Sequence, residues 1–172
     1  MIDYDLKRIR LVVMDVDGVL SRQTVPMNSD GVPMRTADIK DGYVLQLAVK
    51  LGLELAIISG GTLESVRLRY EGLGVKNIYL KAGKKLAVYE QLLEKLGLRN
   101  EEVAYIGDDI PDYQVMSRCG LPCCPGDAAI EIKQVARYIS PFKGGEGCVR
   151  DVIEQILRAQ GRWALDDTAF GW

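Results

Sequence analysis

A chain of 172 residues with 48% hydrophobic residues is long enough to form one globular domain with a sizeable core. Its net charge of −2 provides no basic surface for nucleic acid or an anionic membrane, and no apolar run approaches the length of a membrane span. The chain contains no histidine, which excludes Ser-His-Asp triads, histidine-ligated zinc and histidine general bases. Any catalysis therefore depends on carboxylates, lysine and hydroxyl groups.

The first predicted strand, Leu11–Met14, is a short apolar run of the kind that is buried on both faces of a parallel sheet. Asp15, Asp17 and Gly18 follow it, at the end of the strand where α/β folds bind ligands. Side chains at i and i+2 point the same way, so both carboxylates can face one pocket, where Mg²⁺ would relieve their repulsion. One carboxylate could then act as a nucleophile and the other as a general acid/base. Taken alone, the pair favours an ordinary Asp-x-Asp-Gly turn.

The next segment, residues 21–36, has no helical period and carries a turn signal at Ser29-Asp30-Gly31. It predicts a β-hairpin that projects from the sheet, with prolines suited to edge strands. Its valines and methionines have no evident core to enter, which indicates an interface between subunits.

The rest of the chain alternates between helical and strand patterns, and the elements can be taken in order. We predict helices over 43–51, 62–73, 84–96, 111–119, 127–136 and 148–160, and strands over 53–58, 77–80, 103–106, 121–124 and 137–140. Asp41, Thr62 and Asp127 are the expected N-caps. Residues 162–172 form a tail without regular period. This alternation predicts an α/β fold, with a mostly parallel sheet between two helical layers, in a single domain over 1–172.

The four cysteines, Cys119, Cys123, Cys124 and Cys148, show no zinc-site spacing. The first five residues are acidic and lack the apolar core of a signal peptide. We therefore interpret the cysteines as small buried hydrophobes in a cytoplasmic protein.

Further polar residues stand at the ends of later strands. Ser59-Gly60 ends the second strand, Lys84-Lys85 opens the helix after the third, and Gly107-Asp108-Asp109 ends the fourth, with Asp112 one turn on. Each has a plain explanation as a turn, a surface charge or a helix cap. Their joint occurrence at strand ends instead favours phosphoryl transfer, which needs an in-line nucleophile and neutralisation of the phosphoryl oxygens.

In this order, Asp15-Val16-Asp17-Gly18-Val19, Ser59-Gly60, Lys85 and Gly107-Asp108-Asp109 through Asp112 resemble the four motifs of the haloacid dehalogenase superfamily of phosphatases. The resemblance implies a Rossmann-like fold, with Asp15 as nucleophile and Asp17 as general acid/base. Ser59 and the backbone of Gly60 would bind the transferring phosphoryl group, and Lys85 would neutralise its charge. Asp15, Asp108 and the backbone carbonyl of Asp17 would hold Mg²⁺, oriented by Asp109 and Asp112.

The short hairpin, Lys40-Asp41-Gly42-Tyr43 and Gly144-Gly145-Glu146-Gly147 with Arg150 resemble the small branch of this superfamily that has no cap domain. The resemblance implies a homotetramer whose hairpins meet at its centre and whose neighbouring subunits help to close each active site. It implies a phosphoric monoester hydrolase acting on 3-deoxy-D-manno-octulosonate 8-phosphate, on the way to lipopolysaccharide. Besides Asp17 and Lys85, the implied substrate contacts are Asp38, Ile39, Lys40, Asp41, Gly42 and Arg69.

The sequence departs from this branch at Gly61, where several relatives carry Arg or Glu, and at Gln46, where some carry Arg. Because Gly61 has no side chain to touch a sugar, a nine-carbon acid sugar 9-phosphate is an alternative substrate. Two other readings are a non-catalytic scaffold with the same fold and a response regulator. The scaffold does not require unpaired strand-end carboxylates, and the response regulator leaves Ser59-Gly60 unexplained.

Overall fold

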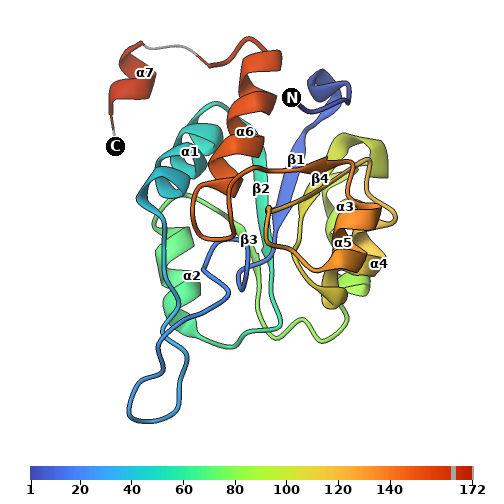
Figure 1. The fold of residues 1–172 in the computed structure, drawn as a ribbon. Coiled ribbons are helices and arrows are strands. Elements are labelled where there is room, and N and C mark those ends of the chain that lie inside the picture. The colour runs from blue at the N-terminus through green and yellow to red at the C-terminus, as the bar shows by residue number, and fades with distance from the viewer. Residues whose placement is uncertain (164–165, 172) are drawn as a thin grey trace.

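The computed structural model describes residues 1–163 and 166–171, and its centre is a six-stranded parallel sheet of order β3-β2-β1-β4-β5-β6 (Figure 1). The strands are β1 (Leu11–Met14), β2 (Glu54–Ile58), β3 (Asn77–Tyr79), β4 (Val103–Ile106), β5 (Leu121–Cys124) and β6 (Tyr138–Ile139). The chain adds strands on one side of β1 and then crosses to β4 and adds strands on the other. The carboxyl ends of β1 and β4 therefore lie where the strand order reverses, which is where open α/β sheets form their binding crevice.

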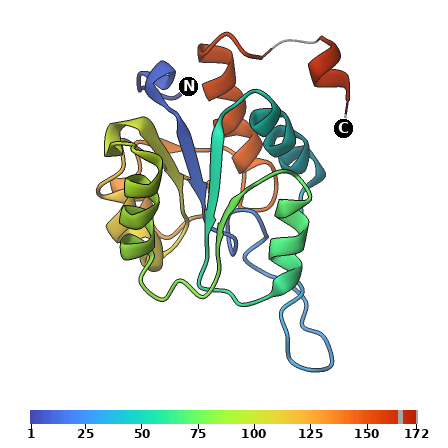
Figure 2. The ribbon, with the colours of Figure 1, turned by 180° about the vertical axis from the view of Figure 1, so that it is seen from behind.

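Helices cover both faces of the sheet, as the predicted α/β fold requires (Figures 1 and 2). One layer contains α1 (Ile39–Lys50), α2 (Glu64–Glu71) and α6 (Cys148–Ala159), and the other contains α3 (Lys85–Leu96), α4 (Tyr113–Met116) and α5 (Ile130–Val135). Short 3₁₀ turns lie at Leu6–Arg8, Asn100–Glu102 and Ile110–Asp112. None of the helices in the described part of the chain is long and apolar enough to cross a membrane.

Strand β1 lies between two separate hydrophobic cores. Val12 and Met14 pack into the core shared with α1, α2 and α6, whereas Leu11 and Val13 pack into the core shared with α3, α4 and α5. All four side chains are fully buried, which is why the strand is continuously apolar rather than alternating. This burial on both faces fixes the position of β1, and therefore the position at which the chain leaves the sheet after Met14.

The predicted helix caps were wrong at all three positions. Helix α1 begins at Ile39, and its cap is Asp38, whose carboxylate accepts the N–H groups of Lys40 and Asp41 at 2.7 and 2.9 Å. Helix α2 follows Leu63 and α5 follows Ala129, and neither residue makes a side-chain cap.

Two of the predicted caps have tertiary partners instead. Asp41 accepts the N–H of Arg150 at 2.7 Å, and Asp127 accepts the N–H of Gly144 at 2.9 Å. A carboxylate that accepts an N–H group from a distant segment is not available to cap its own helix.

The segment 21–36 projects from the molecule as a loop rather than as a two-stranded hairpin (Figure 1). Its arms share one antiparallel bridge, between Met27 and Pro33, and the Asn28 carboxamide oxygen accepts the N–H groups of Asp30 and Val32 across the turn. The predicted turn position is therefore confirmed, but no ladder forms. Proline lacks the N–H that a ladder needs, and residues 26 and 33 are both proline.

The tail is partly regular, because a short helix, α7 (Asp167–Phe170), is capped by Asp166 and lies beside α1. Tyr43 donates its hydroxyl to the Ala169 carbonyl at 2.7 Å. Lys50 reaches the Gly171 carbonyl at 2.8 Å. The prediction of an irregular tail was therefore wrong for α7, and the parts of it at 164–165 and 172 lie outside the described residues. The four cysteines are buried and unpaired.

Candidate active site

The first functional segment leaves the sheet directly after β1. Asp15 still donates its N–H to the Ile106 carbonyl of β4 at 3.0 Å, so the ladder holds its backbone in place. Its side chain is buried, with Oδ1 accepting the Val16 N–H at 2.7 Å. Gly18 has φ +77°, and a Cβ there would overlap the Asp108 carboxylate. Glycine at this position is therefore what allows the β1 loop to lie against the end of β4.

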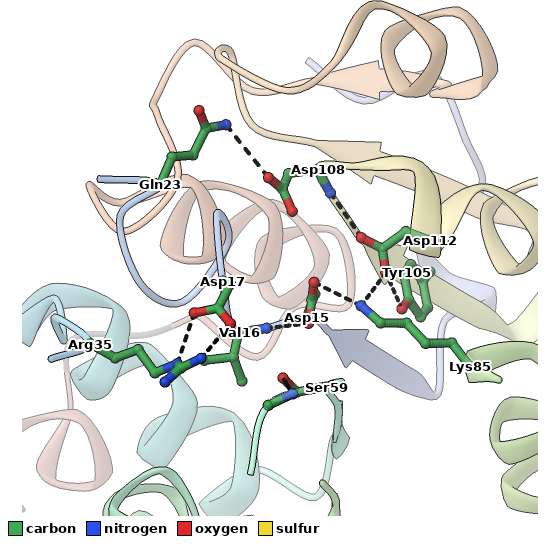
Figure 3. A network of polar contacts seen from close by, with 11 residues as sticks. Asp15, Val16, Asp17, Gln23, Arg35, Ser59, Lys85, Tyr105, Asp108 and Asp112 are labelled. Atoms are coloured by element: carbon green, nitrogen blue, oxygen red, sulfur yellow. Dashed lines mark hydrogen bonds and ion pairs between the residues drawn. The ribbon is translucent and has the colours of Figure 1, made fainter. Parts of the chain in front are cut away.

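Lys85, the first residue of α3, is buried and joins two carboxylates (Figure 3). Its Nζ lies 2.7 Å from Asp15 Oδ2 and 2.8 Å from Asp112 Oδ1. Asp112 also accepts the Tyr105 hydroxyl at 2.6 Å on Oδ1 and the Asp108 N–H at 3.1 Å on Oδ2. Asp112 is fully buried, and both of its oxygens accept hydrogen bonds from neighbouring residues of the site.

Burial and like charges raise the pKa of two carboxyl groups at the centre of this cluster. Burial is the largest cause for Asp108, followed by repulsion from Asp15 and Asp112, and together they raise its pKa to about 8. Burial and Asp112 raise the pKa of Asp15 to about 7, although Lys85 opposes the shift. Burial lowers the pKa of Lys85, but the attraction of Asp15 and Asp112 outweighs it, and the net shift is upward. One ammonium group does not neutralise three buried carboxylates.

This surplus of negative charge fits a divalent cation. Asp15, Asp108 and Asp112 each place a carboxylate oxygen within 4.8 Å of the others. Asp15 and Asp108 line the cavity whereas the fully buried Asp112 does not, so these two are the better ligands, with Asp112 orienting its neighbours. Hard carboxylate oxygens are what Mg²⁺ prefers. The donor set therefore suits Mg²⁺.

Asp17 differs from Asp15 in being half exposed, with 51% of its side chain accessible. The Arg35 guanidinium grips it through two bonds of 2.8 Å, from Nε to Oδ1 and from Nη2 to Oδ2 (Figure 3). Both oxygens of the Asp17 carboxylate are therefore bound by an arginine, and the prediction that its backbone carbonyl helps to hold the metal stays a prediction. Sequence analysis missed Arg35, since no local pattern connects residues that lie 18 positions apart in the chain.

Ser59 follows β2, and its buried hydroxyl accepts the Gly61 N–H at 3.1 Å.

Gln23, a second residue that sequence analysis missed, donates from its carboxamide to Asp108 at 3.5 Å and to the Asp127 carbonyl at 2.9 Å. These residues share a cavity of about 700 Å³. It is lined by Asp15, Asp17, Gly18, Gln23, Ser59, Gly60, Gly61, Ala82, Gly83, Lys85, Asp108, Asp109, Pro111, Asp127 and Ala129.

The six expected sugar contacts lie elsewhere in this chain. Asp38, Ile39 and Lys40 line a larger cavity of about 1030 Å³ between α1 and α6, which contains none of the buried catalytic candidates. Asp41 is buried nearby, and burial is the main cause that raises its pKa to about 6. Arg69 extends its guanidinium toward Gly42. None of the six lines the cavity of Asp15 within one chain.

Known proteins are similar to this chain in sequence and in fold. A family model described as haloacid dehalogenase-like hydrolase matches residues 62–152. The chain is 38% identical to the 3-deoxy-D-manno-octulosonate 8-phosphate phosphatase of Escherichia coli K12 over 156 residues, which cover 91% of this chain and 83% of that protein.

Solved structures of such phosphatases have a similar fold. The phosphatase of the same name from Yersinia pestis has a TM-score of 0.88 and 35% identity, covering 92% of this chain and 85% of that one. The Moraxella catarrhalis phosphatase, solved with magnesium, phosphate and KDO, has a TM-score of 0.87 and 36% identity, covering 91% and 90%.

Proposed function

The chain belongs to the haloacid dehalogenase-like hydrolase family, with 3-deoxy-D-manno-octulosonate 8-phosphate phosphatases among its relatives, and we propose that it hydrolyses this acid sugar phosphate to the free sugar and phosphate. The observation that carries the proposal is the position of Asp15. It is a buried carboxylate held between an N–H and a lysine, beside a second carboxylate and a serine in one cavity. That set supplies a nucleophile and the groups that neutralise a phosphoryl centre.

In the first step, a carboxylate oxygen of Asp15 forms a bond to phosphorus as the bond to the sugar oxygen breaks. The Val16 N–H and the Lys85 ammonium hold the Asp15 carboxylate in a single orientation, which reduces the entropic cost of an in-line attack. Asp17, at the rim of the same cavity, donates a proton to the departing sugar oxygen.

In the second step, Asp17 takes a proton from water, and that water attacks phosphorus and releases Asp15 with inorganic phosphate. Ser59 and the backbone of Gly60 would donate hydrogen bonds to the phosphoryl oxygens, and Lys85 would balance their charge. Asp15, Asp108 and the Asp17 carbonyl would hold Mg²⁺, which supplies charge neutralisation of the transferring phosphoryl group.

We further propose that the chain works as a homotetramer. The apolar side chains of the projecting loop lack a core, and Met27 is 65% and Met34 49% exposed. Leu68 on α2 is 66% exposed. Apolar groups exposed in this way support a contact between subunits. Such a contact could bring Asp38–Gly42 and Arg69 of one subunit to the cavity of another, which a single chain does not do. Light scattering at micromolar concentration should give four times the mass of one chain, and a monomer would contradict this proposal.

The four buried, unpaired cysteines fit a reducing compartment, which supports the cytoplasm as the place of the reaction. A nine-carbon acid sugar 9-phosphate remains the competing substrate, because Gly61 places no side chain against the sugar.

A substrate panel tests the function. We expect kcat/KM in the presence of Mg²⁺ to be highest for the eight-carbon 8-phosphate, lower for nine-carbon acid sugar 9-phosphates, and lower still for ribose 5-phosphate, which has no carboxylate. A chelator should abolish turnover of all of them. Arg118→Ala, which removes an ion pair to Glu90 outside the cavity, is the matched control and should behave as wild type. A higher kcat/KM for a nine-carbon compound would reassign the substrate, and no Mg²⁺-dependent hydrolysis of any phosphate would favour the scaffold.

A further inference from the structure

Within the described part of the chain, the cavity offers no free cationic side chain for the carboxylate of the substrate that it is proposed to accept. An acid sugar phosphate brings two anionic groups, a phosphate and a carboxylate. Among the described residues, Lys85 is the single cationic side chain that lines the cavity, and it is already bonded to Asp15 and Asp112. A carboxylate that enters such a site needs its own charged or N–H-rich partner.

Arg35 is the cation that stands next to the cavity wall. It comes from the return arm of the projecting loop. Its side chain is only 15% exposed, so it packs against the body of the protein. It bonds to Asp17, which lines the cavity, and its Nη2 lies beside Gly61, which also lines the cavity. A Cβ on residue 61 would lie 3.3 Å from that nitrogen. The guanidinium thus fills the space next to a residue that has no side chain.

Arg35 has N–H groups that its hydrogen bonds within the chain do not use. A guanidinium has five N–H groups. One on Nε and one on Nη2 bind Asp17, and one on Nη1 points to the Pro33 carbonyl at 3.5 Å. Within residues 1–163 and 166–171, the second N–H of each Nη has no acceptor. One N–H on each of two terminal nitrogens is the arrangement that binds a carboxylate in a bidentate manner.

We infer that Arg35 determines substrate specificity by binding the carboxylate of the acid sugar with these two N–H groups, while its Nε edge keeps Asp17 in place. The inference rests on the proposed function and deepens it. This role of Arg35 requires glycine at position 61, because a larger residue there would press on Nη2 and obstruct its approach to the cavity.

Inhibition constants separate this role from a simple positioning of Asp17. The unphosphorylated sugar acid 3-deoxy-D-manno-octulosonate, ribose and inorganic phosphate are tested as competitive inhibitors of p-nitrophenyl phosphate hydrolysis. Arg35→Ala should raise the Ki of the sugar acid about 10- to 100-fold, the loss expected for hydrogen bonds to a charged group, and leave the Ki of inorganic phosphate unchanged. Arg35→Lys keeps the charge without the fork and should give an intermediate Ki.

A role limited to positioning Asp17 would lower kcat on every substrate and leave both inhibition constants at their wild-type values, which would overturn the inference. Thermal melting shows whether Arg35→Ala is folded, and Arg35→Lys decides the question if it is not. Arg118→Ala, which loses an ion pair outside the cavity, should keep both constants. If the wild-type enzyme binds the sugar acid no better than ribose, the proposed function fails and the inference with it. If the wild type prefers the acid and Arg35→Ala keeps that preference, the inference alone fails.

Discussion

The residues in and around the cavity form two halves that are built differently. In the inner half, Asp15, Lys85, Asp112 and Tyr105 are buried and joined by bonds of 2.6 to 2.8 Å, and each group is held by at least one other (Figure 3). In the outer half, the pair of Asp17 and Arg35 combines a half-exposed carboxylate with an arginine from a projecting loop.

The difference matches the chemistry proposed for each half. A phosphoryl group is the same in every substrate, so the groups that meet it can be rigid and buried. The leaving group varies between substrates, and it meets residues on a loop that can change without disturbing the core.

The largest expected effect is at the centre of the inner half. Asp15→Asn should lower kcat by about 10⁴-fold or more, because an amide is a far poorer nucleophile than a carboxylate. The fold should survive, because asparagine has nearly the shape of aspartate and places no charge in this buried position. Single-turnover kinetics together with thermal melting check both parts. Turnover near the wild-type rate in a folded Asp15→Asn protein would refute the covalent step.

The next effect concerns the metal. Asp108→Asn should weaken Mg²⁺ binding about 10- to 100-fold, because it removes one of about two carboxylates that would hold the ion. Calorimetric titration of Mg²⁺ into the metal-free protein measures this directly, without reference to activity. Glu90→Gln, at an exposed ion pair outside the cavity, is the control. An unchanged affinity would remove Asp108 from the metal site.

The pH dependence of the metal-free protein gives a third test of the inner half. The pKa of Asp108 rises from 3.8 to about 8 in the folded chain, so the folded state binds this proton more tightly than the unfolded state does. Stability from this group is therefore fully present below about pH 4 and is lost as pH rises toward 8. Thermal melting in a chelator should show a falling Tm across this window, with a shallower slope in Asp108→Asn. An identical slope in both proteins would mean that other groups set the dependence.

The smallest expected effect is on the free energy of unfolding, measured for one variant in each half. Tyr105→Phe removes a buried hydroxyl that donates to Asp112, and it should lower the free energy of unfolding by about 1 to 2 kcal/mol. Gln23→Ala removes a rim side chain whose bond to Asp108 spans 3.5 Å, and it should change that free energy by less than about 0.5 kcal/mol. Urea denaturation of the metal-free proteins measures both. Equal losses in the two variants would mean that the halves do not differ in rigidity.

The sequence alone determined the parallel sheet, the order of its strands along the chain, and the clustering of Asp15, Ser59, Lys85 and Asp108 at one edge. These features depend on local signals: short apolar runs make buried strands, and polar residues at the ends of parallel strands must meet. Helix caps were predicted less well, because Asp41 and Asp127 are typical cap residues that the fold uses to bind the N–H groups of Arg150 and Gly144 instead.

Only the tertiary structure decided which side chains complete the site. Whether Arg35 reaches Asp17, and whether Lys85 joins Asp15 to Asp112, depends on how a projecting loop and a helix start are placed against β1. The same limit applies to the loop itself, which has the turn of a hairpin but not its strands. Periodicity describes which face of an element is buried, and it contains no information on which distant polar group will satisfy a given donor or acceptor. That pairing is settled by packing, since a buried polar group is stable only where the folded chain provides its partner.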